Sequence, residues 1–261
     1  MKKHTTVFLL LITISASSLA QEISCSSSMV LKAVNDSLHK YAVIRNSELR
    51  EGSILDVPVN FSDFSDSVIG KDRSLSCWAS ASLKLDRGVA QLLSNEDLKY
   101  SKIAYQIATD YLPSYDTNLA DQNYDHISFK GFHYNVYINN DDTLKTVELD
   151  ANDRISYAIY GIAWFNENSK DIKSEIEKNA YTEAKRDFKI ADDNINNIYN
   201  SLPTLIRDNL RGEMRNWIKE KNGKCGKIES LADSEISFTE KTKGYRCQTE
   251  MTKKQTERLT E

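Results

Sequence analysis

Four cysteines give the clearest chemical signal in this chain of 261 residues: Cys25, Cys77, Cys225 and Cys247. None of them belongs to a C-x2-C pair, and the four histidines are scattered, so the pattern does not favour a zinc site. Their even number favours two disulfides instead, which persist in proteins that fold in an oxidising compartment. Three pairings of four cysteines are possible.

Groups that could catalyse a reaction are few, and each has a simpler structural explanation. Ser76-Cys77-Trp78 places a cysteine where a nucleophile could act, but Cys77 lies in a strand-like pattern with disulfide partners available. His126 and His133 flank an expected strand and are candidate bases, although ordinary surface or half-buried histidines are commoner. Candidate acids occupy polar, turn-like or solvated helical positions: Asp150, Asp153, Asp192 and Asp193. We therefore predict no enzyme, no metal site and no cofactor.

The N-terminus has the composition of a secretory signal peptide. A basic start precedes the apolar run from Val7 to Ile14, and Ser18-Leu19-Ala20 supplies small residues at both positions that signal peptidase recognises. We expect residues 1–20 to be removed before Gln21. The apolar run is shorter than the roughly 20 residues of a membrane span, and Glu22-Ile23-Ser24 before Cys25 does not suit lipid attachment. A periplasmic or secreted protein without stable membrane insertion is expected.

The charge is unevenly distributed along the expected mature chain. Residues 21–206 contain 19 basic and 28 acidic residues, a net charge of −9. From Arg207 onward there are 13 basic and 10 acidic residues, a net charge of +3. An acidic exported domain disfavours nucleic acid and anionic membranes, and it is compatible with a cationic protein partner. A solvated acidic surface without a binding role is the simpler explanation.

Residues 21–165 are expected to form an α+β domain. Apolar residues at helical spacing predict an amphipathic helix from Ser27 to Val43. Period-two alternation then predicts strands at Leu55 to Phe61 and Ser74 to Leu85, and Tyr100 to Tyr111 is rich in the β-branched and aromatic residues that strands favour.

A β-hairpin follows in the same half. Phe129 to Ile138 alternates with period two, the turn Asn139-Asn140-Asp141-Asp142 comes next, and Leu144 to Leu149 forms the second arm. We therefore predict an antiparallel sheet with one face covered by helix, as in α/β rolls. A Cys25–Cys77 disulfide would join the helix to a strand.

Residues 166–261 are expected to form an all-α domain. The preceding segment, Ile155 to Phe165, fits either a helix or a strand, with helix favoured. Pro203 interrupts the helical pattern, and Asn222-Gly223 is expected to end the following helix. A Cys225–Cys247 disulfide would close this domain, so that each domain folds with its own bridge.

Three segments of the C-terminal third resemble the LprI-like lysozyme-inhibitor family of small, exported, helical bacterial domains. Asp192, Ile195, Asn196 and Tyr199 resemble its D-x-x-L-N-x-x-Y helix. Met214, Arg215 and Trp217, followed by Lys221 and Cys225, resemble its Q-R-x-W…R…C segment. Its closing C-x-x-x-M-T-x-x-R-x-x-x-L element is matched by Cys247, Met251, Thr252, Gln255 and Leu259. Order and approximate spacing agree over about residues 180–261, but Met214, Lys221 and Gln255 replace the family's Gln, Arg and Arg.

Two functional hypotheses remain. The resemblance implies a helical fold, an envelope location and, more loosely, a non-catalytic binding protein that inhibits lysozyme or a similar cationic hydrolase. The alternative is a structural or accessory envelope module, or an immunity protein, that acts through protein contact. Tyr199 and Trp217 lie on apolar helical stripes, so we expect them to pack in the core rather than to meet a partner.

Overall fold

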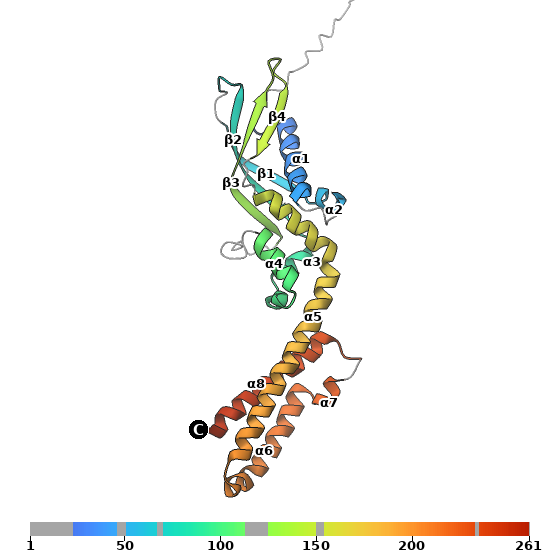
Figure 1. The fold of residues 1–261 in the computed structure, drawn as a ribbon, viewed down its shortest axis with the longest axis vertical. Helices are drawn as coiled ribbons and strands as arrows, with labels where there is room; N and C mark the ends of the chain where they lie inside the picture. Colours follow the sequence, from blue (N-terminus) through green and yellow to red (C-terminus); the bar gives the residue numbers. More distant parts are fainter. Residues whose placement is uncertain are drawn as a thin grey trace, which may run out of the picture.

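The computed structural model describes residues 23–45, 51–66, 70–112, 125–149, 154–232 and 235–260. The expected signal peptide and the candidate acids Asp150 and Asp153 lie outside these residues. The described chain is elongated, with a sheet region at one end, a helical region at the other, and one long helix joining them (Figure 1). It is a mixed α+β protein, as the sequence predicts.

The sheet has four antiparallel strands in sequential order: β1 (Val59–Asp66), β2 (Ser74–Lys84), β3 (His126–Ile138) and β4 (Leu144–Leu149). The predicted strand at Ser74 to Leu85 and the predicted hairpin are confirmed. The first strand begins later than predicted, because Glu51–Leu55 forms helix α2. The Val57 carbonyl oxygen accepts a hydrogen bond from His39 Nε2 at 2.9 Å, and Pro58 has no backbone N–H to donate to a neighbouring strand. Strand pairing therefore starts at Val59.

The predicted first helix is confirmed as α1 (Ser28–Arg45), which packs against β4 and α5. Alternate residues of β2 are buried on the covered face of the sheet, from Leu75 to Leu83. A disulfide joins Cys25 to Cys77, and the Tyr134 hydroxyl donates a hydrogen bond to the Cys25 carbonyl oxygen at 2.6 Å. One large apolar core thus includes α1, the sheet and the first half of α5.

Three short helices follow β2: α3 (Arg87–Leu93), the 3-10 helix η1 (Glu96–Tyr100) and α4 (Lys102–Tyr111). The segment from Tyr100 to Tyr111 is therefore helical rather than extended, despite its β-branched and aromatic residues. Ala104 and Ala108 are fully buried in α4, which packs against α5. Tertiary packing on this small-residue face outweighs the local strand preference.

The longest element is α5 (Arg154–Ser201), a helix of 48 residues. It includes Ile155 to Phe165, so the predicted helix is confirmed there. Its first half is buried in the core of the sheet region, and its second half packs against α8. The proposed division into residues 21–165 and 166–261 falls within this helix.

The remaining helices are α6 (Thr204–Cys225), α7 (Ile228–Leu231) and α8 (Phe238–Thr260). The prediction that Asn222-Gly223 ends α6 is wrong, because the helix continues to Cys225. Gly226 has φ 86°, so this glycine adopts the positive φ that the helix end requires. The Cys225–Cys247 disulfide then joins the end of α6 to α8.

Candidate functional site

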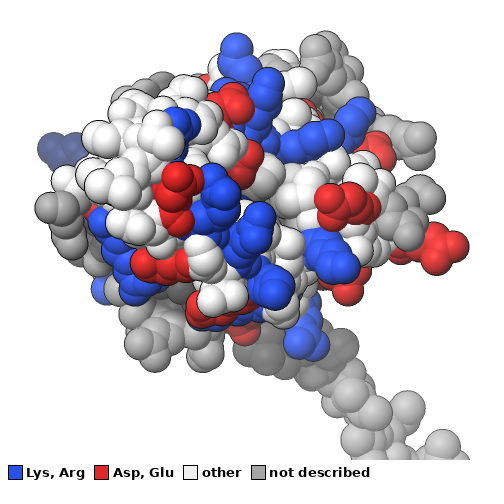
Figure 2. All heavy atoms as spheres, turned by 90° about the horizontal axis from the view of Figure 1, so that it is seen from below, with Lys and Arg blue, Asp and Glu red and all other residues white. Residues whose placement is uncertain are grey.

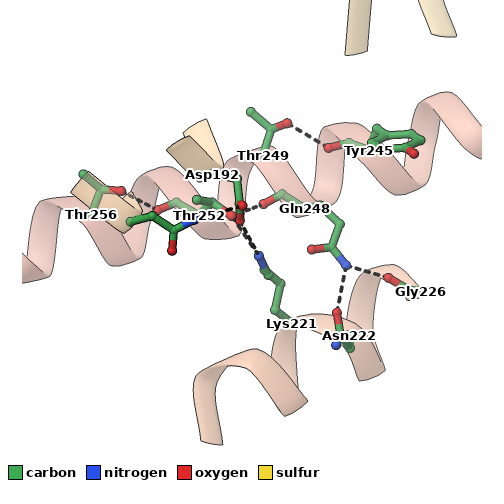
Figure 3. A network of polar contacts seen from close by, with 10 residues as sticks. Asp192, Lys221, Asn222, Gly226, Tyr245, Gln248, Thr249, Thr252 and Thr256 are labelled. Atoms are coloured by element: carbon green, nitrogen blue, oxygen red, sulfur yellow. Dashed lines mark hydrogen bonds and ion pairs between the residues drawn. The ribbon is translucent and has the colours of Figure 1, made fainter. Parts of the chain in front are cut away.

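The helical region has an unusually polar interior. Its buried apolar cluster is small, with Ala184, Leu231 and Tyr245 at its centre. Polar side chains fill much of the remaining space between α5, α6 and α8 (Figure 3). The fully buried or nearly buried polar residues of α8 are Lys241, Thr242, Gln248, Thr249, Thr252 and Gln255.

Lys221 of α6 lies at the centre of these contacts and is 5% exposed. Its Nζ donates a hydrogen bond to Thr252 Oγ1 at 3.2 Å and lies 3.9 Å from Asp192 Oδ1. The ammonium also lies 4.6 Å from the ring centroid of Trp217 and 5.4 Å from that of Phe188. Residues of all three motif segments therefore meet at one lysine (Figure 3).

Burial lowers the pKa of Lys221 below the ordinary lysine value, and the nearby Asp192 carboxylate partly offsets this effect. Between its lowered pKa and 10.5 the unfolded chain binds more protons at this site than the folded chain does. The contribution of this lysine to the free energy of unfolding must therefore rise with pH across that window.

Replacement of Lys221 by methionine is expected to remove this rise. Asp192 keeps 40% of its side chain exposed, so the loss of its partner leaves no fully buried charge. We expect the free energy of unfolding of Lys221→Met to equal or exceed that of the wild type near neutral pH, and to lose this advantage toward pH 10.5. Urea unfolding over a pH series measures the difference. Lys219→Met, at an exposed position of the same helix, is the control. Parallel pH profiles for Lys221→Met and the wild type would contradict the expectation.

Gln248 joins α8 to the end of α6. Its Nε2 donates to the Gly226 carbonyl oxygen at 2.5 Å and to Asn222 Oδ1 at 3.3 Å. Its Oε1 is the one buried side-chain oxygen without a hydrogen bond among the described residues. The hydroxyls of Thr249 and Thr252 donate to carbonyl oxygens one turn earlier in α8, which satisfies them inside the helix.

Two of the positions that depart from the family pattern contact each other. Gln255 Nε2 lies 3.6 Å from Met214 Sδ. The third departure, Lys221, forms an ion pair with Asp192 through a single ammonium, which cannot form the two parallel hydrogen bonds that a guanidinium can. All three positions thus take part in side-chain contacts inside the helical region.

The motif on α5 positions the turn between α5 and α6. Tyr199 donates a hydrogen bond from its hydroxyl to the Arg207 carbonyl oxygen at 2.9 Å. Asn196 Nδ2 donates to Asp192 Oδ2 at 3.1 Å, and Ile195 is buried. Tyr199 is half-buried and tethers the first turn of α6 instead of filling the core, contrary to the prediction.

The two connecting residues and the first turn of α6 together span residues 202–207, which we call the α5–α6 turn. The expected apolar stripe of α6 is only partly covered: Leu205 is 74% exposed, Ile206 is 45% exposed and Ile218 is 44% exposed. The turn lies at the end of the molecule farthest from the sheet (Figure 1). Lys and Arg side chains are prominent on that end, with Asp and Glu between them (Figure 2).

The other motif residues have mixed exposure. Trp217 is half-buried, so the expectation of a core tryptophan is wrong, and its ring instead flanks Lys221. Arg215 is exposed, Thr252 is buried, and Met251 and Leu259 are half-buried. Met251 Sδ lies 3.5 Å from Cys225 Sγ, beside the disulfide.

The sheet region brings together a pair that sequence reasoning missed. Ser76 Oγ lies 2.7 Å from His133 Nε2, and the His133 ring lies 4.6 Å from that of Trp78. The alternation of β2 and β3 could have predicted that these side chains share one sheet face. It could not have predicted the register that sets them side by side.

The other candidate catalytic residues of the sheet region already have partners. His126 pairs with Asp125, and Cys77 is in a disulfide. In the part of the chain that the structure describes, no group of three or more His, Cys, Asp and Glu is arranged to hold a metal ion.

A groove of about 670 Å³ lies where the sheet region meets the helical region. Its lining includes Lys170 and Lys173 of α5 together with Asp97 and Arg246. Arg246 donates to both carboxylate oxygens of Asp97, at 2.8 and 3.3 Å, and this contact raises the pKa of the guanidinium. This ion pair joins η1 to α8.

None of the described helices is both long enough and apolar enough to cross a membrane.

Comparison with known proteins bears on the helical region alone. No curated protein and no solved structure gives a significant match to the chain. The model of a family described as lysozyme inhibitor LprI matches residues 167–259. The match begins within α5 and reaches the last turns of α8, so it contains the Lys221 contacts and the α5–α6 turn. The C-terminal part of this chain is thus similar to the lysozyme inhibitor LprI family, which confirms the resemblance seen in the motifs.

Proposed function

We propose that this is an exported, non-catalytic binding protein that inhibits lysozyme or a similar hydrolase of the bacterial envelope. The observation that carries this proposal is the family match over residues 167–259. The motif residues of that range serve structural roles: they fix the α5–α6 turn and the contacts around Lys221. Such roles suit a protein that acts by presenting a rigid surface.

Export is supported by the two disulfides and by the signal-peptide pattern of residues 1–20. We expect the mature protein to begin at Gln21 and to be released by osmotic shock without detergent. Intact-mass measurement of the released protein checks both points. A lipid-modified N-terminal cysteine would contradict this part of the proposal.

Electrostatic attraction supports a cationic partner. The net charge of −9 over residues 21–206 draws a positively charged protein toward the inhibitor over distances of about 10 Å at 0.1 M salt. We expect the association rate to fall roughly tenfold or more between 20 and 300 mM salt, with a smaller change in the dissociation rate. Stopped-flow binding measures both rates.

A turbidity assay on bacterial cell walls tests the inhibition directly. A panel of lysozymes of different types is mixed with a large excess of the purified protein, and the rate of clearing is compared with that of enzyme alone. Loss of clearing for at least one lysozyme supports the proposal. Full activity of all of them would favour the second candidate, an accessory or immunity module. The N-terminal sheet region supports this alternative, because the family model does not cover it.

A further inference from the structure

We propose that the α5–α6 turn is the inhibitory element, and that it enters the glycan-binding cleft of the hydrolase. This inference rests on the proposed function and specifies the surface that performs it. The turn lies inside the range matched by the inhibitor family and at the free end of the elongated molecule (Figure 1). A projecting turn of this kind can enter a cleft, which a flat face cannot.

The apolar residues of the turn point to a buried contact with a partner. Leu205 is 74% exposed, more than any other large apolar side chain among the described residues, and Ile206 beside it is 45% exposed. They follow Pro203 at the start of α6. Two adjacent exposed apolar side chains at the tip of a projection leave apolar surface in water, and burial of that surface against a partner favours binding. Neighbouring exposed apolar side chains, unlike single scattered ones, mark surfaces that contact other molecules.

The turn is held rigid before any partner arrives. The Tyr199 hydroxyl bonds to the Arg207 carbonyl oxygen at 2.9 Å, and the Arg207 backbone N–H donates to the Pro203 carbonyl oxygen at 3.0 Å. The Leu202 backbone N–H donates to the Tyr199 carbonyl oxygen at 3.3 Å. The proline ring restricts the backbone further. Little conformational entropy is therefore lost when the turn binds.

The basic residues in and behind the turn are complementary to the acidic groups of a glycosidase cleft. Arg207 lies in the turn, and Arg211 and Arg215 follow it at intervals of four residues along α6. A glycosidase cleft contains a pair of catalytic carboxyl groups roughly 5–9.5 Å apart. A guanidinium can form two parallel hydrogen bonds with one such carboxylate. The acidic half of the chain would thus attract the cationic enzyme, and the basic helix end would meet its acidic cleft.

An anionic lipid surface is the rival partner for an apolar and basic tip. Asp208 and Glu213 lie among the three arginines, and Asp208 pairs with Arg211. This interleaving weakens attraction to an anionic membrane, because that attraction grows with the number of basic residues near the lipid surface. A cleft with two localised carboxylates suits the pattern better.

The test uses the full-length protein and a lysozyme that it inhibits. Chitotriose, a saccharide that occupies the cleft, should raise the apparent dissociation constant linearly with its concentration, as a competitor for the same site does. Leu205→Glu combined with Ile206→Glu should weaken binding at least 100-fold. Ile190→Glu, at an α5 position 60% exposed and outside the turn, should weaken it less than threefold. Circular dichroism and the unfolding midpoint should be the same for both variants.

Three results would overturn the inference and leave the proposed function standing. If the wild type inhibits but chitotriose has no effect, the cleft is not the binding site. If the turn variant and the Ile190 variant bind equally well, the turn is not the contact. If vesicles of anionic lipid bind the wild type but not the turn variant, and the turn variant still inhibits as strongly as the wild type, the turn is a lipid contact. Failure of the wild type to inhibit any lysozyme would refute the proposed function itself and this inference with it.

Discussion

Simultaneous replacement of Cys225 and Cys247 by serine is expected to undock α6 and α7 from α8 while the sheet region stays folded. The helical region has a buried apolar cluster centred on only three residues, and much of its interior is polar. Buried hydrogen bonds contribute only about 0.5–1.5 kcal/mol each to net stability. The disulfide spans 22 residues, and on the chain-entropy model it contributes about 3 kcal/mol. Its loss removes a large share of what holds these helices together.

The matched control is the Cys25→Ser, Cys77→Ser variant. That disulfide spans 52 residues and contributes about 4 kcal/mol on the same model. It lies in the large core, which retains α1, the sheet and α5 without it. Native-state hydrogen exchange should show fast exchange throughout α6 and α7 for the first variant alone. Equal protection of α6 in both variants would mean that helix packing, and not the bridge, holds the helical region.

The second large effect is expected for Phe165→Ala. Phe165 lies in α5 and is fully buried in the sheet-region core, where its ring meets Trp164 edge-on at 5.3 Å. Loss of a fully buried phenylalanine costs roughly 3–5 kcal/mol. Trp217→Ala should cost only about 1–2 kcal/mol, because its ring is half-buried and contributes mainly its contact with Lys221.

Equilibrium urea unfolding of the two variants and the wild type measures this difference. The Trp217 variant should also retain most of its inhibitory activity, since the ring lies away from the α5–α6 turn. A cost for Trp217→Ala equal to that for Phe165→Ala would show that the tryptophan anchors a core after all.

Much of the fold could be predicted from hydrophobic period. The amphipathic α1, the strand β2 and the β3–β4 hairpin all follow from the spacing of apolar residues, and the change of period suggested which cysteines pair. The errors arise where tertiary contacts decide. The first strand starts at Val59 because His39 binds the Val57 carbonyl group, and no local pattern contains that contact. Tyr100 to Tyr111 is helical because it packs against α5.

The candidate site was predicted less completely. The motif positions were identified, but the periodicity of α6 could not show that Leu205, Ile206 and Ile218 have too few neighbours to cover them. A stripe of apolar residues reveals which face is apolar and not whether another element lies against it. Lys221 was noticed only as a departure from the family pattern, because a buried lysine has no periodic signal.

Hydrogen exchange of the full-length protein, with and without a lysozyme that it inhibits, shows directly whether the α5–α6 turn is the inhibitory contact. The backbone amides of residues 202–211 should gain protection in the complex, while the amides of the four sheet strands should exchange at unchanged rates. Protection of the strands with no change at the α5–α6 turn would contradict this expectation.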